Sequence, residues 1–411
     1  MQSTTINNIT FGAKIRSVPS ISRIAGQRTV LPNLNLNGYN ALIGCDVFTP
    51  TCRILKHDLL FKDGKLIAID DFNEYEVESK INYTFLDGKT VAPAIFDEHI
   101  HGGYGISFHD SDETEIRSLL KLLAQNGTGA VIATMLPGSA EHIRNQIQVL
   151  NNIIKNPDKD AAKIYGIHLE GPFLNRDKKG IHSIRDLMFP TIENYESFNP
   201  ENIKIVTLAP ELDDGYKLTK YLQKLGVVVS AGHSMASADD LIQSGIRQVT
   251  HIFNAMAPLH HRIPTIANEG LNNPKVTAEL LADENSVIPS VMNMIMKLKP
   301  KEKIVLISDA LPNAGLKGDF VMNNKVIHVG EDMVPRDADG TLAGNMRFLY
   351  DAAKILIGKT CMTFRDFIRY ASVNPARNMG AANDFTIKEG ATPSFSVWDN
   401  KELIPEKTFI A

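Results

Sequence analysis

Between residues 91 and 308 the chain alternates apolar runs of strand length with segments that have the apolar period of an amphipathic helix. Continuous runs such as IVLIS and VVVSA are typical of strands buried on both faces, as strands are in a parallel sheet. Eight such units in succession predict an α/β fold, a (β/α)8 TIM-like barrel. The runs are 91–100, 129–135, 163–170, 203–208, 227–231, 248–252, 276–281 and 304–308.

Shorter strand-like runs flank this region on both sides; they are 40–47, 59–62, 66–70 and 395–398. The Asp63-Gly64 step lies between two of these runs and is a strong hairpin signal. We therefore predict that segments 36–90 and 386–411 come together as one small β-sandwich domain. Residues 91–385 would form the barrel.

The first 35 residues differ in composition from the rest. No Asp or Glu precedes Asp46, whereas basic residues occur among many Ser, Thr and Asn. Such a lead is compatible with an organelle transit peptide, with a disordered tail and with extra strands, so 1–35 is treated as an N-terminal extension. It lacks the apolar region of a secretory signal.

The overall composition argues against several classes of function. The 43 basic and 47 acidic residues are interspersed and give a net charge of −4, so no nucleic-acid partner is expected. No apolar stretch approaches the roughly 20 residues that span a bilayer, so no membrane partner is expected. Three cysteines without a CxxC spacing indicate a reducing compartment, and the cytoplasm is the expected location.

Ten of the twelve histidines lie between His99 and His261. In the sequence HIH at 99–101 the two imidazoles are two residues apart, so on a strand they point to one face and can bind one metal ion. An HxH pair alone is a weak signal, and a lone histidine is more often structural. Here, however, ionisable residues occur at five predicted strand ends, where a barrel keeps its active site. They are His99 with His101, Glu170, His233, His251 and Asp309.

Groups of this kind are costly to bury unpaired, and a divalent cation satisfies them together. We therefore predict a metal centre at the C-terminal rim of the barrel. Imidazole and carboxylate ligands without cysteine favour zinc, iron, cobalt or manganese, with zinc as the first choice. From its residue type alone, Asp309 is also a good helix N-cap, and this alternative stays open.

Several strings in the barrel match, in order, the motifs of one enzyme family. The most specific is HLEGPF at 168–173, followed by KKGIH at 178–182. From about residue 40 to its C-terminus the chain resembles the N-acetylglucosamine-6-phosphate deacetylases of the amidohydrolase superfamily. The other matching strings are HIHGGYG at 99–105, AGHS at 231–234, THIFNAM at 250–256, SDA at 308–310 and LAGN at 342–345.

The resemblance implies a set of metal ligands. Glu170, His233 and His251 match the family's constant ligands. His99 and His101 match the pair that some members use for a second metal. One or two divalent ions per subunit are therefore implied, and Glu170 would bridge them if there are two.

The resemblance also implies two catalytic residues. Asp309 matches the general base that takes a proton from the attacking water and later returns it to the leaving amine. His182 matches the residue that polarises the acetamide carbonyl. His168 shares a strand face with Glu170, and we expect it to support the site through a hydrogen bond rather than to bind metal.

Substrate recognition is implied by three further matches. Asn254, the backbone amide of Ala255, and Arg262 correspond to the family's phosphate contacts. An arginine fork suits phosphate oxygens, and in the family's homodimer Arg262 would come from the partner subunit. The alternative is that Arg262 belongs to a solvated basic loop.

The implied activity is metal-dependent hydrolysis of the N-acetyl group of N-acetylglucosamine 6-phosphate, giving glucosamine 6-phosphate and acetate. One departure affects the substrate: Ser286 stands where the family has a histidine that contacts it. Two alternatives therefore remain. The chain could be an amidohydrolase for another N-acylated amino sugar, such as N-acetylgalactosamine 6-phosphate, or for a cyclic amide. It could also be a non-catalytic sugar-phosphate-binding protein.

Overall fold

The computed structural model of the chain describes residues 36–70, 81–322, 325–338, 340 and 344–411. The predicted extension 1–35 lies outside the described residues, and so do the first two residues of the LAGN string, 342–343. None of the described helices is long and apolar enough to cross a membrane.

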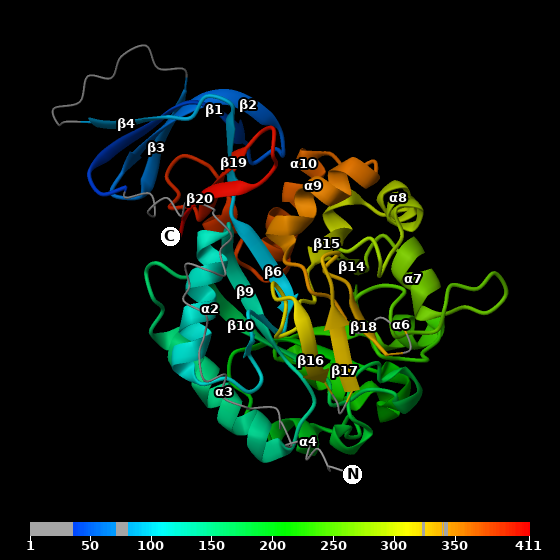
Figure 1. Ribbon diagram of the computed structural model, residues 1–411. Helices are drawn as coiled ribbons and strands as arrows, with labels where there is room; N and C mark the ends of the chain where they lie inside the picture. The colour runs from blue at the N-terminus through cyan, green and yellow to red at the C-terminus, as the bar shows by residue number, and fades with distance from the viewer. Residues whose placement is uncertain (1–35, 71–80, 323–324, 339, 341–343) are drawn as a thin grey trace, which may run out of the picture.

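Eight parallel strands form the barrel, and each pairs with the next one along the chain (Figure 1). This arrangement confirms the predicted barrel fold. The strands are β6 (Ile95–Ile100), β9 (Thr128–Met135), β10 (Lys163–Glu170), β11 (Ile203–Leu208), β12 (Val228–Ala231), β13 (Gln248–Val249), β14 (Thr277–Leu281) and β15 (Ile304–Ile307).

The barrel closes between its first and last strands at the carboxyl end. The backbone N–H of Asp309, just after β15, donates to the carbonyl oxygen of His99 in β6 over 2.8 Å. The N–H of His101 donates in turn to Ala310 over 2.9 Å. The residues that close the barrel are thus the predicted site residues or their direct neighbours.

Two predicted runs differ from the observed strands. The run 91–100 divides into β5 (Lys89–Pro93), which joins another sheet, and β6, with Ala94 as the only residue between them. The run 248–252 is a strand only to Val249. It stops there because His251 has a φ of 30°, which is incompatible with extended backbone.

Helices cover the outside of the barrel (Figure 1). In α2 the residues Ile116, Leu119 and Leu123 recur at helical spacing and are buried, and fully burying side chains of this size stabilises the fold by about 1.5–3 kcal/mol each. The helices are α2 (Glu113–Gln125), α3 (Ala140–Lys155), α4 (Ile192–Glu196), α5 (Lys217–Lys224), α6 (Ala238–Ser244), α7 (Ile266–Asn272), α8 (Pro289–Leu298), α9 (Leu349–Lys359), α10 (Phe364–Ile368) and α11 (Asn374–Asn378).

A seven-stranded mixed sheet unites the N-terminal and C-terminal segments, as predicted. Its own apolar core includes Phe61, Val91 and Phe395. Asp63 and Gly64 form the predicted hairpin turn with φ values of 50° and 78°, the left-handed pair that a two-residue hairpin requires. The strands are β1 (Tyr39–Phe48), β2 (Ile54–Lys62), β3 (Lys65–Asp70), β4 (Ile81–Phe85), β5, β19 (Phe395–Asp399) and β20 (Pro405–Phe409). The exact domain limits at residues 35, 90 and 385 stay a prediction.

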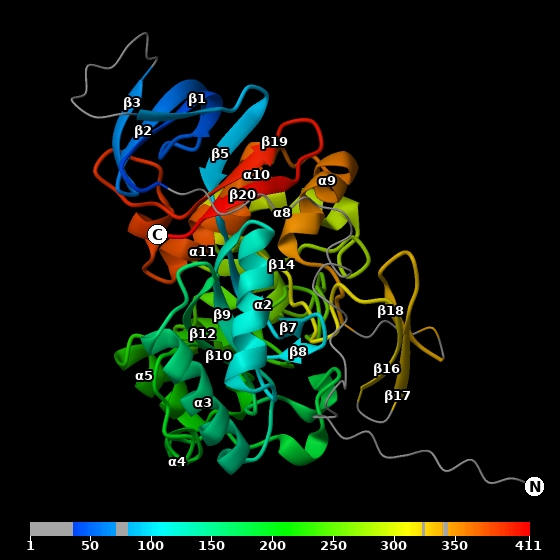
Figure 2. The same cartoon turned by 60° about the vertical axis from the view of Figure 1, so that its left-hand side comes forward.

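The sequence analysis did not predict a three-stranded antiparallel sheet that follows β15. It stands to one side of the barrel in Figure 2. Its strands are short and carry mixed polar and apolar residues, so they give no clear period. They are β16 (Gly318–Met322), β17 (Lys325–Val329) and β18 (Pro335–Asp337). Two short strands, β7 (Gly102–Gly103) and β8 (Ile106–Ser107), pair directly after β6.

Candidate metal centre and active site

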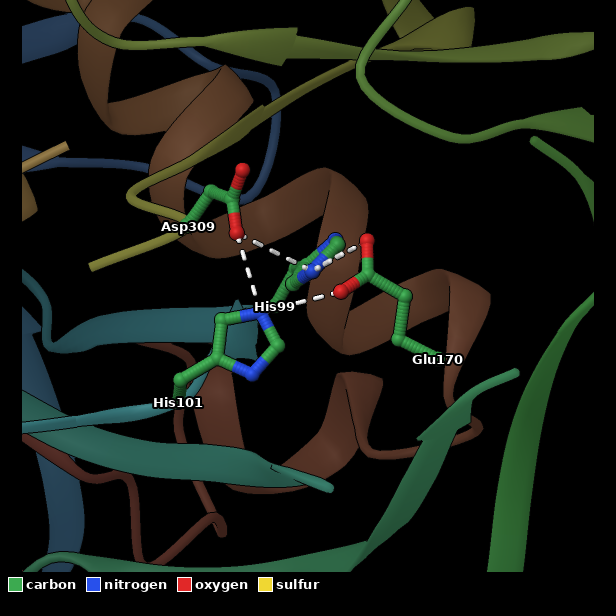
Figure 3. A group of neighbouring side chains, drawn as sticks. All are labelled: His99, His101, Glu170 and Asp309. Atoms are coloured by element: carbon green, nitrogen blue, oxygen red, sulfur yellow. Dashed lines mark ion pairs between the residues drawn. The ribbon is translucent and has the colours of Figure 1, made fainter. Parts of the chain in front are cut away.

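The predicted ligands meet at the carboxyl end of the barrel. Glu170, the last residue of β10, lies at the centre of the group, and its side chain is 3% exposed. Figure 3 shows His99, His101 and Asp309 on one side of it. The structure thus brings together every residue predicted to bind metal, with both predicted catalytic residues beside them: His99, His101, Glu170, His182, His233, His251 and Asp309.

One half of the centre is formed by the HIH pair and two carboxylates (Figure 3). Nε2 of His99 lies 3.4 Å from Oε1 of Glu170 and 3.3 Å from Oδ1 of Asp309. Nε2 of His101 lies 3.1 Å from Oε2 of Glu170 and 3.1 Å from Oδ1 of Asp309. The two imidazoles therefore face both carboxylates.

The other half of the centre uses the same Glu170. Its Oε1 lies 3.2 Å from Nε2 of His233 and 3.1 Å from Nε2 of His251. The two imidazole nitrogens are 3.0 Å apart. Three ligand atoms from three strand ends thus converge on one point.

These spacings fit a bound cation. Bonds of about 2.0–2.1 Å to a tetrahedral ion place its ligand atoms roughly 3.3 Å from one another. The distances between ligand atoms here are 3.0–3.4 Å. In addition, Nε2 of His99 is buried and has no hydrogen-bond partner within the described residues. The cluster can bind a divalent metal, and because Glu170 belongs to both halves, it can hold one ion or two.

Two imidazoles are oriented by contacts behind the centre. Nδ1 of His233 donates to the carbonyl oxygen of Lys178 over 2.7 Å, which leaves Nε2 with its lone pair facing Glu170. Nδ1 of His99 lies 3.2 Å from Oε2 of Glu279. Such contacts fix both the tautomer and the ring orientation of a metal-binding histidine.

Glu279 was missed by the sequence analysis. It is fully buried in β14, and its carboxylate also accepts hydrogen bonds from the N–H of His251, over 3.3 Å, and from Nε2 of Gln248, over 2.7 Å. The available signal was a carboxylate inside the otherwise apolar run 276–281. A buried acidic residue requires partners, and here the partners include two predicted metal ligands.

Three site residues have left-handed backbones. The φ values are 47° for His233, 30° for His251 and 49° for Asp309. Each residue lies directly after a barrel strand or within a few residues of it, and the backbone leaves the extended conformation there. Left-handed residues other than glycine and asparagine cost on the order of 1 kcal/mol or more, and such strain is concentrated at functional sites.

The electrostatic environment keeps both acidic groups ionised. Burial alone would raise the pKa of Glu170, but His99, His101, His182 and His233 hold it well below its ordinary value. For Asp309, burial is likewise outweighed by the two imidazoles of the HIH pair, so its pKa is also lowered. Both carboxylates are therefore negatively charged at neutral pH and can bind a cation.

Asp309 is the most accessible member of the cluster, with a side chain 19% exposed. The helix N-cap alternative is wrong, because a turn and then β16 follow Asp309 rather than a helix. Its carboxylate is therefore free to face the metal centre and the open end of the barrel.

His182 lies beside the centre on the loop that follows β10. Its Nε2 is 3.4 Å from Oε2 of Glu170, and its ring packs edge-on against His233. The same side chain lines a cavity of about 420 Å³ together with Leu136, Ile181 and Leu311. His182 thus lies next to the centre and also borders this cavity.

His168 does not join the cluster. Its two ring nitrogens lie 3.3 Å from the hydroxyl of Thr134 and 2.8 Å from that of Thr207. Burial holds its pKa well below the ordinary value. These contacts agree with the expected supporting role.

Two of the predicted phosphate contacts follow β13. The N–H of Asn254 donates to the carbonyl oxygen of His251 over 2.9 Å. Ala255 has a left-handed φ of 47°, and its N–H makes no hydrogen bond to another described residue. That amide is thus available to an anion.

Arg262 lies apart from the cluster, on an exposed loop. Its backbone N–H donates to Nδ1 of His260 over 3.1 Å. Its guanidinium forms no hydrogen bond or ion pair with the described part of the chain. The structure of a single chain therefore does not bring Arg262 to the metal centre.

Ser286 is engaged by its own loop. Its hydroxyl donates to Oδ2 of Asp283 over 2.6 Å, and its N–H donates to the same oxygen over 3.0 Å. The neighbouring Glu284 is held by Arg347 and Lys359. A short hydroxyl used in this way does not reproduce the reach of an imidazole.

The family model of the amidohydrolase family matches residues 90–411, which include the whole barrel and all of the residues described above. The chain belongs to the amidohydrolase family. The predicted membership is therefore confirmed, and this family comprises metal-dependent hydrolases.

Curated relatives of this amidohydrolase include two kinds of deacetylase. It is 28% identical over 355 residues to N-acetylglucosamine-6-phosphate deacetylase from Lysinibacillus sphaericus, covering 84% of this chain and 90% of the relative. The human enzyme of that name is 27% identical over 379 residues, with coverages of 87% and 91%. N-acetylgalactosamine-6-phosphate deacetylase from Escherichia coli O157:H7 is 28% identical over 333 residues, with coverages of 79% and 85%.

Solved structures agree with the fold of this amidohydrolase. N-acetylglucosamine-6-phosphate deacetylase from Thermotoga maritima superposes with a TM-score of 0.78 at 26% identity, covering 90% of this chain and 99% of that one. A Mycobacterium smegmatis variant in complex with N-acetyl-D-glucosamine-6-phosphate gives a TM-score of 0.80 at 24% identity, with coverages of 91% and 100%. At 24% identity, the similarity to the Mycobacterium smegmatis structure supports the fold alone.

Proposed function

We propose that this amidohydrolase removes the acetyl group of N-acetylglucosamine 6-phosphate by metal-dependent hydrolysis, giving glucosamine 6-phosphate and acetate. One observation carries the proposal: Asp309, an accessible carboxylate, lies 3.1–3.3 Å from the HIH imidazoles within a cluster that fits a divalent cation. The deacetylase names of the relatives supply the substrate class.

The proposed ligands are Glu170, His233 and His251 for one ion, and His99 and His101 with Glu170 for a second. Zinc is the first choice for imidazole and carboxylate ligands, and iron, cobalt or manganese are the alternatives. When bound, such an ion supplies Lewis acidity and makes water a competent nucleophile near neutral pH.

Asp309 would be the general base and later the general acid. Its lowered pKa keeps the carboxylate ready to take a proton from the attacking water. The amine is a poor leaving group until it is protonated, so the same proton then passes to the amide nitrogen. The hydrogen bond from the N–H of Asp309 to His99 holds the residue in place for both transfers.

His182 would act on the acetamide carbonyl. As a side chain that lies next to the metal centre and borders the cavity, it can donate a ring N–H to the carbonyl oxygen and stabilise the negative charge that develops there. A preorganised donor of this kind lowers the barrier by about 3–4 kcal/mol in other enzymes.

Phosphate binding would combine the free N–H of Ala255, the side chain of Asn254 and a guanidinium. Arg262 is exposed and has no acidic partner among the described residues, which suits contact with a second copy of the chain. The proposed assembly is a homodimer in which Arg262 of the partner subunit reaches the phosphate. The proposed location is the cytoplasm, since all three cysteines, Cys45, Cys52 and Cys361, are free thiols.

A second substrate is favoured by one specific observation. Ser286 replaces the histidine expected to contact the substrate, and its hydroxyl is occupied by Asp283. A relative that is also 28% identical to this chain is named N-acetylgalactosamine-6-phosphate deacetylase. Identity at this level therefore does not distinguish between the two epimeric sugar phosphates as substrates. N-acetylgalactosamine 6-phosphate is therefore the alternative substrate. The intact ligand cluster speaks against a protein that only binds sugar phosphate.

The test is acetate release by the purified protein after metal is supplied. The substrates are N-acetylglucosamine 6-phosphate, its galactosamine epimer and unphosphorylated N-acetylglucosamine. Preferred turnover of the first supports the proposal, whereas preferred turnover of the second establishes the alternative. Absence of acetate release from all three, in protein shown to contain metal, would contradict both.

A further inference from the structure

A second group of ionisable side chains lies at the mouth of the barrel, apart from the Glu170 cluster. His109 and Asp110 occupy the turn after β8, and His142 lies in the first turn of α3. All three line the 420 Å³ cavity that His182 also lines. None of them has a part in the proposed deacetylation.

The three side chains converge. Nε2 of His142 lies 3.3 Å from Oδ1 of Asp110 and 2.9 Å from the carbonyl oxygen of His109. The two imidazole rings are 4.5 Å apart between their centres. One potential ligand atom from each residue can be chosen so that all three lie within 4.8 Å of one another.

His109 is the member that ordinary hydrogen bonding leaves unexplained. It is only 8% exposed, yet its Nδ1 has no hydrogen-bond partner within the described ranges of the chain. A buried polar atom that stays unpaired destabilises the fold, because it loses its hydrogen bonds to water. An interaction between Asp110 and His142 alone would not require the imidazole of His109 at this position.

The surroundings leave room for this ring. Gly138 allows its close approach, because a Cβ at residue 138 would lie 3.1 Å from Cε1 and 3.3 Å from Nε2 of His109.

We propose that His109, Asp110 and His142 form a second metal site, which binds a divalent transition-metal ion such as Zn²⁺. Two imidazoles and one carboxylate are an established three-residue ligand set for zinc, which leaves one position for water or an anion. If Nε2 of His142 is the ligand atom, it would give up its proton and its contact with the carbonyl oxygen of His109 when the ion binds beside Asp110. The open position would be on the side of the cavity.

The bound ion would connect two separate loops. The residues come from the segment between β8 and α2 and from the start of α3, so the ion would cross-link the loops that follow β6 and β9. Residues of both loops line the cavity together with His182 and Leu311. The inference does not depend on the proposed deacetylase activity, because it concerns different residues.

The experiment counts bound zinc. Full-length protein is stripped with a chelator and dialysed against buffered Zn²⁺, and the metal per chain is measured for wild type, His142→Ala and His328→Ala. The exposed His328 of β17 is a matched control, because its Nδ1 lies 2.7 Å from Asp319 of β16 and the described residues add no third ligand. We expect His142→Ala to lose one ion per chain and His328→Ala to lose none. Equal counts in wild type and His142→Ala would overturn the proposal.

A second comparison separates the two centres. Glu170→Gln weakens the central cluster but leaves His109, Asp110 and His142 intact. One Zn²⁺ per chain should remain in Glu170→Gln and disappear when His142→Ala or the isosteric Asp110→Asn is added. Circular dichroism establishes that each variant is folded. If a folded double variant keeps the same number of ions as Glu170→Gln, the site does not exist.

Discussion

The backbone N–H of Asp309 donates to the carbonyl oxygen of His99 over 2.8 Å. This hydrogen bond connects the last barrel strand with the first, and it also sets the distance between the proposed general base and a proposed metal ligand. The side chains of the same two residues approach to 3.3 Å. The same pair of residues thus takes part both in closure of the barrel and in assembly of the candidate site.

Replacing Asp309 with asparagine should stop the reaction without emptying the centre. The amide cannot accept a proton from water, and proton transfer by a positioned side chain contributes about 10²–10⁴-fold. We expect kcat to fall by at least about that factor while Glu170 and the four imidazoles keep the metal. Steady-state kinetics and metal analysis of the same preparation test this. Normal turnover in Asp309→Asn would remove its assigned role.

Arg262→Ala should weaken substrate binding rather than the chemical step. If the guanidinium contacts only the phosphate, its loss raises KM for the phosphorylated sugar and changes kcat little. Arg53→Ala, at an exposed position in the connection between β1 and β2, is the control. The informative comparison is KM for phosphorylated and unphosphorylated sugar. Arg262 has no phosphate role if wild type hydrolyses the two equally well.

Glu279→Gln should lower metal affinity although Glu279 is not a proposed ligand. The change removes the charge that faces Nδ1 of His99, and loss of such a supporting contact typically costs 10–100-fold in metal affinity. Competition with a chromophoric chelator measures the affinity. Glu269→Gln on α7, where the carboxylate contacts Asn273, is the control and should leave the affinity unchanged. Unchanged affinity in both variants would show that His99 is oriented without Glu279.

Asp399 should make the small sheet sensitive to acid. Hydrogen bonds from the N–H groups of Glu402 and Lys401, together with Lys89, lower the pKa of Asp399 to about 2. An unfolded Asp titrates near 3.9, so between roughly pH 4 and pH 2 the unfolded chain binds more protons at this residue. The stabilisation is present above pH 4 and is lost as the pH falls toward 2.

Thermal unfolding of wild type and Asp399→Asn across this range tests that expectation. The variant should be less stable than wild type at pH 7, and the difference should shrink as the pH approaches 2. Asp214→Asn is the comparison, because it removes an exposed carboxylate that pairs with Lys217 on the surface. A stability difference for Asp399→Asn that does not change with pH would rule out this linkage.

The sequence was most informative where the apolar pattern of a segment and its place in the order of strands led to the same prediction. Continuous apolar runs predicted the barrel because strands buried on both faces leave no alternation in the sequence. Active sites of such barrels lie at the carboxyl ends of the strands. Once the order of the strands was predicted, Glu170 and His251 could therefore be predicted to lie on the same rim. The metal cluster could therefore be predicted without knowledge of any single contact.

The features that were missed depend on contacts between distant residues. Glu279 lies in an apolar run, and its partner His99 is in a strand at the other end of the barrel order. The end of β13 at Val249 reflects left-handed backbone at His251, which residue type does not predict. Likewise, only the structure shows that the hydroxyl of Ser286 donates to Asp283.

The pairing of β5 with β19 has a consequence for the order of folding. Val91 lies opposite Val397, and the whole barrel is encoded between them. During synthesis β5 emerges long before β19, so the edge of β5 that pairs with β19 stays uncovered until the last strands leave the ribosome. Contacts between residues so far apart form slowly. A nascent chain of this amidohydrolase should therefore be most prone to aggregation in the interval between completion of the barrel and arrival of β19.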